Sequence, residues 1–259
     1  MIFKRVSVFF GFFVFVIYFG LILSLFYFFD KDLFFKTALS ERALYSITLS
    51  LGVATIVTIL SLIFAIPSAY ALSRCDFFGK SFVDTMLELP MVVSPAALGA
   101  MLLIFFNNPL GEWIQQHSFQ FVFTVYGIIL AQFFTTVGVC IRLIKAAMDE
   151  IPQRYEDVAK SLGVPPFKAF LKVTLALSKK GIIASLILTW AKAIGEFGAT
   201  ITIAGSMAMN TETLPIAIFM RLSTADIEGT VSLILILLSV GLITLYSVRL
   251  LTHKRTLSD

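Results

Sequence analysis

Residues 6–28, VSVFFGFFVFVIYFGLILSLFYF, form a run of 23 positions without a single charged side chain. A transmembrane α-helix needs about 20 predominantly apolar residues to cross the hydrocarbon of a bilayer, so this run predicts one span. It follows Lys4 and Arg5, as the apolar core of a signal peptide would, but it is longer than such a core. No small-residue cleavage site precedes Asp30. We therefore expect a retained helix.

The whole chain shares this apolar character. Of its 259 residues, 58% are hydrophobic and 14% are charged, whereas soluble domains have about 45–50% apolar and about 25% charged residues. A water-soluble fold could not cover so much apolar surface, and the same composition excludes intrinsic disorder. The length allows roughly five to seven spans and leaves no room for a separate soluble catalytic domain.

Five further apolar runs are long enough to cross a membrane, and none alternates as the strands of a β-barrel do. We therefore predict an all-α membrane protein that forms a single transmembrane domain over residues 1–259. Its six predicted transmembrane helices cover residues 6–28, 43–72, 85–106, 121–144, 181–204 and 231–251.

The basic residues indicate how these spans are oriented. An even number of spans places both termini on one side, and that side carries 15 of the 20 Lys and Arg residues. They are Lys4, Arg5, Arg74, Lys80, Arg142, Lys145, Arg154, Lys160, Lys168, Lys172, Lys179, Lys180, Arg249, Lys254 and Arg255. Because short loops rich in Lys and Arg stay in the cytoplasm, we expect a multi-pass protein of the cell membrane (inner or plasma membrane) with both termini cytoplasmic.

Motifs of metal or nucleotide chemistry are absent from the sequence. It contains two His and two Cys, no HExxH or CxxC spacing, and no GxxxxGK[ST] phosphate loop. We therefore expect no metal, no cofactor and no catalytic residue in this chain. The basic pI near 9.1 follows from the membrane topology, so it does not call for a nucleic-acid partner.

One predicted loop is longer and more charged than the others, and it covers residues 145–180. It predicts a first helix over residues 152–162 that ends at Gly163. A second helix opens at Pro165 and Pro166, since proline suits a helix N-terminus. An apolar stripe at helical spacing follows, made of Phe167, Phe170, Leu171 and Leu175.

A protruding helical pair with an apolar stripe fits two interpretations. It could dock onto a partner protein, or it could lie on the membrane surface with Lys168 and Lys172 toward anionic lipid. The residues alone leave both interpretations open.

The same loop resembles the EAA-x3-G-x9-I-x-L-P signature of the permease subunits of ABC importers. Residues 157–159 (DVA), Gly163 and residues 173–176 (VTLA) match it in part, with Asp for Glu, Val for Ala and Ala for the final Pro. In that family the loop docks into a groove on a cytoplasmic ATPase subunit. The resemblance therefore implies docking, and the residues it assigns are Glu156, Asp157, Ala159, Gly163, Val164, Pro165 and Phe167.

Two charged residues fall within the fifth predicted span. Lys192 and Glu196 are four positions apart, which places them on one face of a continuous helix, and Thr200 continues that face. An unpaired charge at the bilayer centre costs about 2.5–3.5 kcal/mol. The pair therefore predicts either an intrahelical ion pair that fixes the rotation of the helix, or a lining or gate of a translocation path.

A second resemblance covers these charged residues. Residues 190–200, WAKAIGEFGAT, are similar to the W-x-[RK]-A-x-G-E-F-G-A stretch of the molybdate, tungstate and sulfate branch of the same permeases. Residues 89–95, LPMVVSP, are similar to LPLVLPP in that branch, with Ser94 in place of a proline. Pro90 and Pro95 also free backbone carbonyls, which membranes tolerate where protein covers them or they line a cavity. The likeness extends over about residues 43–250.

These resemblances imply the type I permease fold of an ABC importer. They also imply that the importer translocates a tetrahedral oxyanion, with molybdate or tungstate favoured over sulfate. They also imply a homodimer with a second copy of the chain, two copies of an ATPase subunit that hydrolyses ATP, and an extracytoplasmic oxyanion-binding protein. The translocation path or gate would then include Ser94, Lys192, Glu196 and Thr200.

Two other classes of function remain as alternatives. A stand-alone secondary transporter would use Lys192 and Glu196 to couple transport to protons or sodium. A membrane scaffold or assembly factor would transport nothing. Neither alternative needs an ATPase on the 145–180 loop.

Overall fold

The computed structural model describes the backbone of residues 2–253 and the side chains of residues 3–246, and all the regular structure in this part of the chain is helical. Lys254 and Arg255, which the orientation argument counts, lie outside the described residues. The elements, in order, are α1 (Ile2–Leu25), η1 (Phe26–Phe28), α2 (Lys31–Ala38), α3 (Glu41–Arg74), α4 (Lys80–Val92), α5 (Pro95–Phe106), α6 (Pro109–His117), α7 (Val125–Asp149), α8 (Arg154–Ser161), α9 (Pro166–Ala169), the π-helical turn η2 (Phe170–Thr174), α10 (Leu175–Leu177), α11 (Lys179–Ile194), α12 (Gly198–Ala204), α13 (Leu214–Ser223) and α14 (Ile227–His253).

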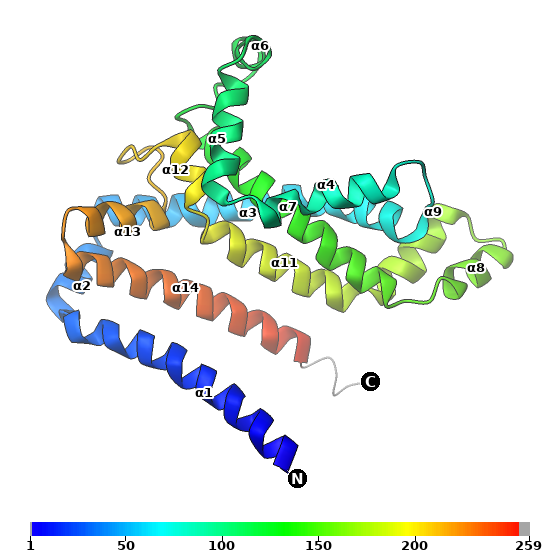
Figure 1. The fold of residues 1–259 in the computed structure, drawn as a ribbon, viewed down its shortest axis with the longest axis horizontal. Coiled ribbons are helices and arrows are strands. Elements are labelled where there is room, and N and C mark those ends of the chain that lie inside the picture. The colour runs from blue at the N-terminus through cyan, green and yellow to red at the C-terminus, as the bar shows by residue number, and fades with distance from the viewer. Residues whose placement is uncertain (1, 254–259) are drawn as a thin grey trace.

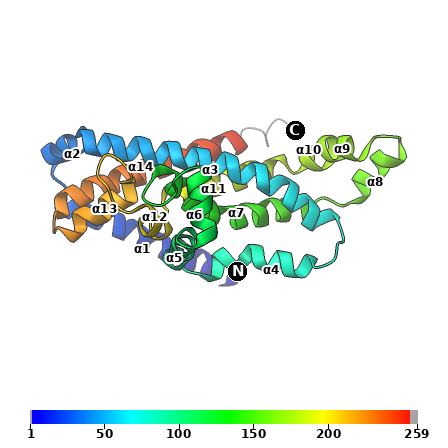
Figure 2. The ribbon, with the colours of Figure 1, turned by 90° about the horizontal axis from the view of Figure 1, so that it is seen from above.

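The centre of the molecule is a bundle of α3, α7 and α11, which run side by side in Figures 1 and 2. Small side chains make this close packing possible, as they do between membrane helices in general. Ala54 and Ala65 of α3 and Ala131 of α7 are fully buried. The hydroxyls of Ser61 on α3 and Thr136 on α7 lie 3.2 Å apart and form a hydrogen bond inside the bundle.

Helix α1 stands apart from this bundle, as Figure 1 shows. The apolar window of the Phe3–Phe28 span has no buried residue. Because lipid tails are as apolar as these side chains, a membrane helix does not need to pack against the rest of the chain to be stable. The first predicted span is therefore long and apolar enough to cross a membrane on its own.

Four helices are continuous candidate spans, namely Phe3–Phe28, Glu41–Arg74, Val125–Asp149 and Ile227–Tyr246. The remaining two predicted spans are each a bent pair of helices, so the described residues form up to six spans if each pair counts as one. Helix α4 meets α5 at 111°, and α11 meets α12 at 53°. The third and fifth predicted spans are therefore bent and not continuous helices.

The bend between α4 and α5 has a local cause in Pro95. Proline disfavours the helical region for the residue before it, and Ser94 accordingly has φ −62° and ψ 146°. Val93 is extended as well. Pro90, the other predicted break, remains inside α4. Two ion pairs, Arg142–Glu88 and Lys145–Asp84, hold α4 to α7.

The two ends of the bundle carry different elements, as Figure 1 shows. Helices α8 and α9 lie at one end, and α2 and α13 lie at the other. Helix α14 runs from the α2–α13 end toward the α8–α9 end, and α1 runs in the opposite direction. The start of α1 and the end of α14 therefore both point toward the side of the 145–180 loop, which fits the predicted common side for both termini.

The connection between α12 and α13, residues 205–213, is fastened to the start of α3. Glu212 is fully buried and accepts two hydrogen bonds from Arg42, at 2.7 Å from Nε and 2.6 Å from the second guanidinium nitrogen. The Tyr45 hydroxyl donates to the Asn210 carbonyl at 3.0 Å, and the Leu214 amide donates to Ser50 Oγ at 2.7 Å. These contacts fix the loop at the end of the molecule opposite to the 145–180 loop.

Candidate functional site

The 145–180 loop is anchored by a buried carboxylate at its root. Glu156 of α8 is 2% exposed. Its Oε1 accepts a hydrogen bond from the Tyr70 hydroxyl at 2.7 Å and lies 2.9 Å from Lys160 Nζ. Its Oε2 accepts from Thr174 Oγ1 at 2.7 Å. Glu156 thus joins α8 to the end of α3 and to the turn η2.

Arg74, in the last turn of α3, extends this root to the end of α7. Its guanidinium donates to the carbonyls of Met148 at 2.8 Å and Ile151 at 2.6 Å. Its Nε lies 4.0 Å from Glu156 Oε2. The ends of α3 and α7 and both halves of the loop are therefore bound into one polar cluster, which consists of Tyr70, Arg74, Glu156, Lys160 and Thr174.

The cluster keeps Glu156 ionised. Burial alone would raise the pKa of its carboxyl, but the hydrogen bonds from Tyr70, Lys160 and Thr174 outweigh burial and lower the pKa below its usual value. The sequence argument placed Glu156 among the docking residues. Its side chain instead points into the protein, so it can support a docking surface but does not present itself on that surface.

The turn between the two short helices has the geometry that the sequence predicted for Gly163. Gly163 has φ +84°, a region that side chains rarely adopt. The Gly163 amide donates to the Lys160 carbonyl at 2.9 Å, and the Val164 amide donates to the Ala159 carbonyl at 3.1 Å. This pair of bonds is a Schellman motif, which ends α8 at Ser161.

The far side of the loop presents apolar side chains to the exterior. Val158 is 58% exposed, Leu162 80% and Phe167 70%, and the Asp157 side chain beside them is 57% exposed. Ala159 and Val164 are half-buried, and Pro165 is exposed. We call Asp157, Val158, Leu162 and Phe167 the loop tip. Exposed apolar groups next to a charge, on a rigid root, are typical of a protein-interaction surface.

The predicted apolar stripe of the second helix divides between two directions. Phe167 points outward, whereas the Phe170 ring packs on Tyr70 with 4.6 Å between ring centroids. The second helix is also not regular, because a π-helical turn covers Phe170–Thr174. Thr174 thereby reaches Glu156, a contact that an ideal helical period does not predict.

The two helix breaks inside the membrane form a second cluster. At the start of α5, Ser94 Oγ accepts a hydrogen bond from the Ala97 amide at 3.3 Å. At the start of α12, Glu196 Oε1 accepts one from the Ala199 amide at 3.1 Å, and Glu196 is 5% exposed. Each break is therefore closed by a side chain that caps the helix after it.

Glycines bring these two breaks into contact. A Cβ on Gly198 would lie 3.0 Å from the Ala96 nitrogen and 3.2 Å from Pro95 Cβ. A Cβ on Gly99 would lie 2.7 Å from the Ala199 carbonyl oxygen. The starts of α5 and α12 thus meet at a distance that only glycine allows, which brings the amide ends of both helices into one region of the molecule.

Lys192 and Glu196 do not share a continuous helix face. Helix α11 ends at Ile194, and the chain turns through Gly195 and Phe197 before α12 begins. The prediction of a shared helix face was therefore wrong. No ion pair within 4.0 Å joins Lys192 to Glu196, so the structure does not contain the ion pair that was one of the two alternatives. Lys192 is half-buried on α11, and Thr200 is buried on α12 with its hydroxyl unpaired in the described part of the chain.

Sequence reasoning missed Tyr70, Arg74 and Thr174. Tyr70 lies in the second predicted span, Arg74 lies just beyond the end of that span, and Thr174 lies in the second half of the loop signature. No motif in the sequence marks these three residues as a group. Only the folded chain brings Tyr70 to Glu156, 86 positions away.

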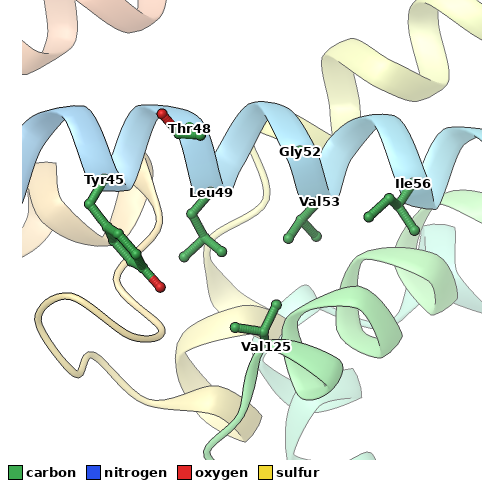
Figure 3. Close-up of a pocket in the computed structure, with 7 residues that line it drawn as sticks. All are labelled: Tyr45, Thr48, Leu49, Gly52, Val53, Ile56 and Val125. Atoms are coloured by element: carbon green, nitrogen blue, oxygen red, sulfur yellow. The ribbon is translucent and has the colours of Figure 1, made fainter.

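An apolar hollow between α3 and the start of α7 offers no ion site. Figure 3 shows that its lining comes from one face of α3, with Val125 from the start of α7 opposite. The lining residues are Tyr45, Thr48, Leu49, Gly52, Val53, Ile56 and Val125. None of them is charged, so this hollow suits lipid hydrocarbon better than a charged solute.

Comparisons with known proteins agree with the all-helical membrane fold. The family model described as the inner membrane component of binding-protein-dependent transport systems matches residues 57–256. This chain belongs to that family, the permeases of ABC importers, and it is a multi-pass membrane protein.

Several curated relatives in this family are similar over most of their length. The molybdenum transport system permease protein ModB of Haemophilus influenzae is 34% identical over 204 residues, which cover 77% of this chain and 89% of ModB. The sulfate transport system permease protein CysT of Escherichia coli is 30% identical over 214 residues, which cover 82% of this chain and 76% of CysT.

Solved structures of ABC transporters share the fold. A bacterial alginate ABC transporter in complex with a periplasmic protein bound to an alginate pentasaccharide has a chain with a TM-score of 0.76. That match covers 98% of this chain and 96% of the other, at 15% identity. The methionine ABC transporter MetNI in inward-facing conformations gives a TM-score of 0.61 at 14% identity, over 83% of this chain and 99% of the other.

Proposed function

We propose that this chain is the membrane-spanning subunit of an importer for a tetrahedral oxyanion, and that molybdate or tungstate is its substrate in preference to sulfate. Relatives named for molybdenum and for sulfate transport support the class of substrate. ATP hydrolysis takes place on a separate cytoplasmic ATPase subunit, since the sequence contains no phosphate-binding loop.

The observation that carries the proposal is the 145–180 loop with its buried ionic root and exposed apolar tip. The tip contacts the ATPase through Asp157 and Phe167, while Ala159, Gly163, Val164 and Pro165 set the shape of the turn. Glu156 fixes this turn to the ends of α3 and α7 through its hydrogen bonds. A movement of the ATPase is then passed to the spans and not absorbed by a flexible loop.

The two helix breaks supply the translocation path. Broken membrane helices in transporters direct the positive ends of half-helices toward anionic substrates. Here the starts of α5 and α12 meet near Ser94 and Thr200. Glu196 would repel a dianion, but its carboxylate already accepts the Ala199 amide inside the protein, and Lys192 adds a positive charge on the neighbouring helix.

The assembly contains a second copy of this chain, two ATPase subunits and an extracytoplasmic oxyanion-binding protein. The path lies between the two permease copies. The 145–180 loop and both termini face the cytoplasm. The alignment with transporter chains that were solved in complexes supports these kinds of partner.

Charge reversal at the loop tip tests the docking. We expect Asp157→Lys to release the ATPase subunit during purification, because the side chain is exposed and its loss disturbs little inside the loop. Asp76→Lys is the matched control, since Asp76 is fully exposed on the α3–α4 connection and pairs only with Lys80. Retention of the ATPase by Asp157→Lys at the level of the control would contradict the docking.

Removal of the Glu196 charge tests the gate. Glu196→Gln keeps an acceptor for the Ala199 amide, so the helix cap survives while the charge is lost. We expect altered basal ATP hydrolysis or altered coupling of hydrolysis to uptake. If uptake, basal hydrolysis and coupling are all unchanged, Glu196 is a structural helix cap and does not belong to a gate.

A further inference from the structure

An apolar groove lies where the 145–180 loop joins the membrane bundle. One wall is Ile66 of α3, and the other comes from the end of the loop and the start of α11. The lining residues are Ile66, Leu171, Leu175, Ala176, Lys179, Ile182 and Ile183. All of them are apolar except Lys179, which is exposed at the first position of α11.

Four lysines on this segment are exposed, namely Lys168, Lys172, Lys179 and Lys180. None of them has a carboxylate within 4.0 Å among residues 3–246. Two other lysines on this side of the molecule are paired. Lys145 pairs with Asp84 and Asp149, and Lys160 pairs with Glu156 and Asp157. The segment that lines the groove therefore carries uncompensated positive charge, with Lys179 at the groove itself and Lys172 next to the lining residue Leu171.

With α3 and the broken span that begins at Lys179 placed across a bilayer, the groove lies at the boundary between hydrocarbon and head groups. Ile66 is eight positions before the end of α3, which is about 12 Å along the helix axis at about 1.5 Å per residue. Ile182 and Ile183 belong to the broken candidate span that begins at Lys179. The inner part of the groove is thus at the level of the acyl chains, and the lysines of the lining segment are at the level of the phosphates.

We propose that this groove binds an anionic phospholipid, with one acyl chain on Ile66, Leu175 and Ile182 and the phosphate near Lys172 and Lys179. The apolar floor selects a chain, and the unpaired lysines select a negative head group. A soluble partner does not reach the floor, because Ile66 and Ile182 belong to candidate spans. The loop tip, which we assign to the ATPase, uses other residues.

Lipid titration of the purified permease tests the site. The protein in detergent is titrated separately with phosphatidylglycerol and phosphatidylcholine, and bound lipids are counted by native mass spectrometry. Each lysine near an anionic head group strengthens binding about fivefold. We therefore expect wild-type protein to prefer phosphatidylglycerol by about fivefold or more, and the double variant Lys172→Gln/Lys179→Gln to lose this preference.

Lys31→Gln/Lys36→Gln is the matched control. It removes the same charge from exposed lysines of α2 at the other end of the molecule, and we expect it to keep the wild-type preference. An equal loss in both double variants would overturn the proposal, because lipid charge would then act on the whole protein and not at the groove. Retention of the preference by Lys172→Gln/Lys179→Gln would overturn it as well.

A variant that fills the groove tests the acyl-chain half. Ala176→Trp adds a ring at an exposed lining position and leaves all four lysines in place. We expect phosphatidylglycerol to bind at least fivefold more weakly, with an unchanged unfolding temperature in lipid-free detergent. Unchanged affinity, or displacement of the lipid by millimolar inorganic phosphate in the wild type, would show a site for the head group alone and overturn this half. None of these readouts depends on the transported substrate or on the ATPase.

Discussion

Helix α3 carries a buried carboxylate partner near each of its ends, and the two arrangements differ. Near its end, Glu156 has hydrogen-bonding partners in Tyr70, Lys160 and Thr174. Near its start, Arg42 binds the Glu212 carboxylate through two parallel hydrogen bonds and is its one side-chain partner among residues 3–246. The first carboxylate distributes its charge over several groups, and the second relies on one.

The difference indicates how much movement each loop tolerates at its end of α3. A carboxylate with several partners keeps most of them if the loop shifts, so the 145–180 loop can move with α3 without losing its root. The 205–213 loop is held in one geometry by a planar, bidentate pair. Because α3 has 34 residues, it is about 50 Å long and connects the two ends as a single rigid element.

The largest expected effect is at the single-partner end. Arg42→Ala leaves Glu212 without its counter-charge, but the Arg42 side chain is 52% exposed, so solvent screens part of the loss. We expect a loss of about 2 kcal/mol of unfolding free energy. Arg42→Lys keeps the charge and loses the bidentate geometry, so we expect this variant to lose about 1 kcal/mol of unfolding free energy. Thermal or denaturant unfolding in detergent measures both. Two variants as stable as the wild type would remove the contrast between the ends.

At the opposite end, the loss of one partner should cost less. Tyr70→Phe removes one hydrogen bond to a charged acceptor, which is worth about 1.5 kcal/mol, and Lys160 and Thr174 still hold Glu156. The same unfolding experiment applies. A loss as large as that of Arg42→Ala would mean that Glu156 depends on Tyr70 alone.

Acid should weaken the Glu156 cluster next. The pKa of Glu156 is lower in the folded protein than the usual value of about 4.3. Its contribution to stability is therefore complete above that usual value and is lost as the pH falls through the lower, folded pKa. Between pH 7 and pH 3 we expect the wild type to lose more stability than Glu156→Gln. Parallel pH curves for the two proteins would contradict this linkage.

The smallest expected effect separates the turn of the loop from an ordinary turn. Gly163 and Gly79 both have positive φ, at +84° and +80°, and at both sites the position that a Cβ would take is free of other atoms within 4 Å. Alanine in the left-handed region costs about 1 kcal/mol at either site. We expect Gly163→Ala also to reduce ATP-driven uptake, and Gly79→Ala to leave uptake unchanged, because only Gly163 shapes the proposed docking surface. Equal uptake by both variants would make Gly163 merely structural.

Much of the fold could be predicted from the sequence, because long apolar runs mark membrane helices directly. The run 43–72 became Glu41–Arg74, two residues longer at each end. The fourth run was less accurate, since residues 121–124 precede α7 and the helix continues to Asp149. The first loop helix, expected over 152–162, covers Arg154–Ser161, and its glycine stop was confirmed.

The bends and the partners could not be predicted, because they depend on distant parts of the chain. We extended the helical period of α11 across Gly195, and this placed Glu196 and Thr200 on the wrong helix face. A glycine allows the chain to turn, but the sequence does not predict the angle of the turn. Glu156 looked like a surface acid because its neighbours in sequence are charged. Its burial follows from Tyr70 and Thr174, which only the fold brings near.

ATP-driven uptake in reconstituted vesicles tests the central claim most directly. The permease, its ATPase and its binding protein are reconstituted together, and labelled molybdate is supplied on the binding-protein side with ATP on the other. We predict accumulation that requires ATP, falls at least tenfold with Asp157→Lys and is unchanged with Asp76→Lys. Accumulation that proceeds without the ATPase, driven by a proton or sodium gradient, would contradict the account and support a secondary transporter.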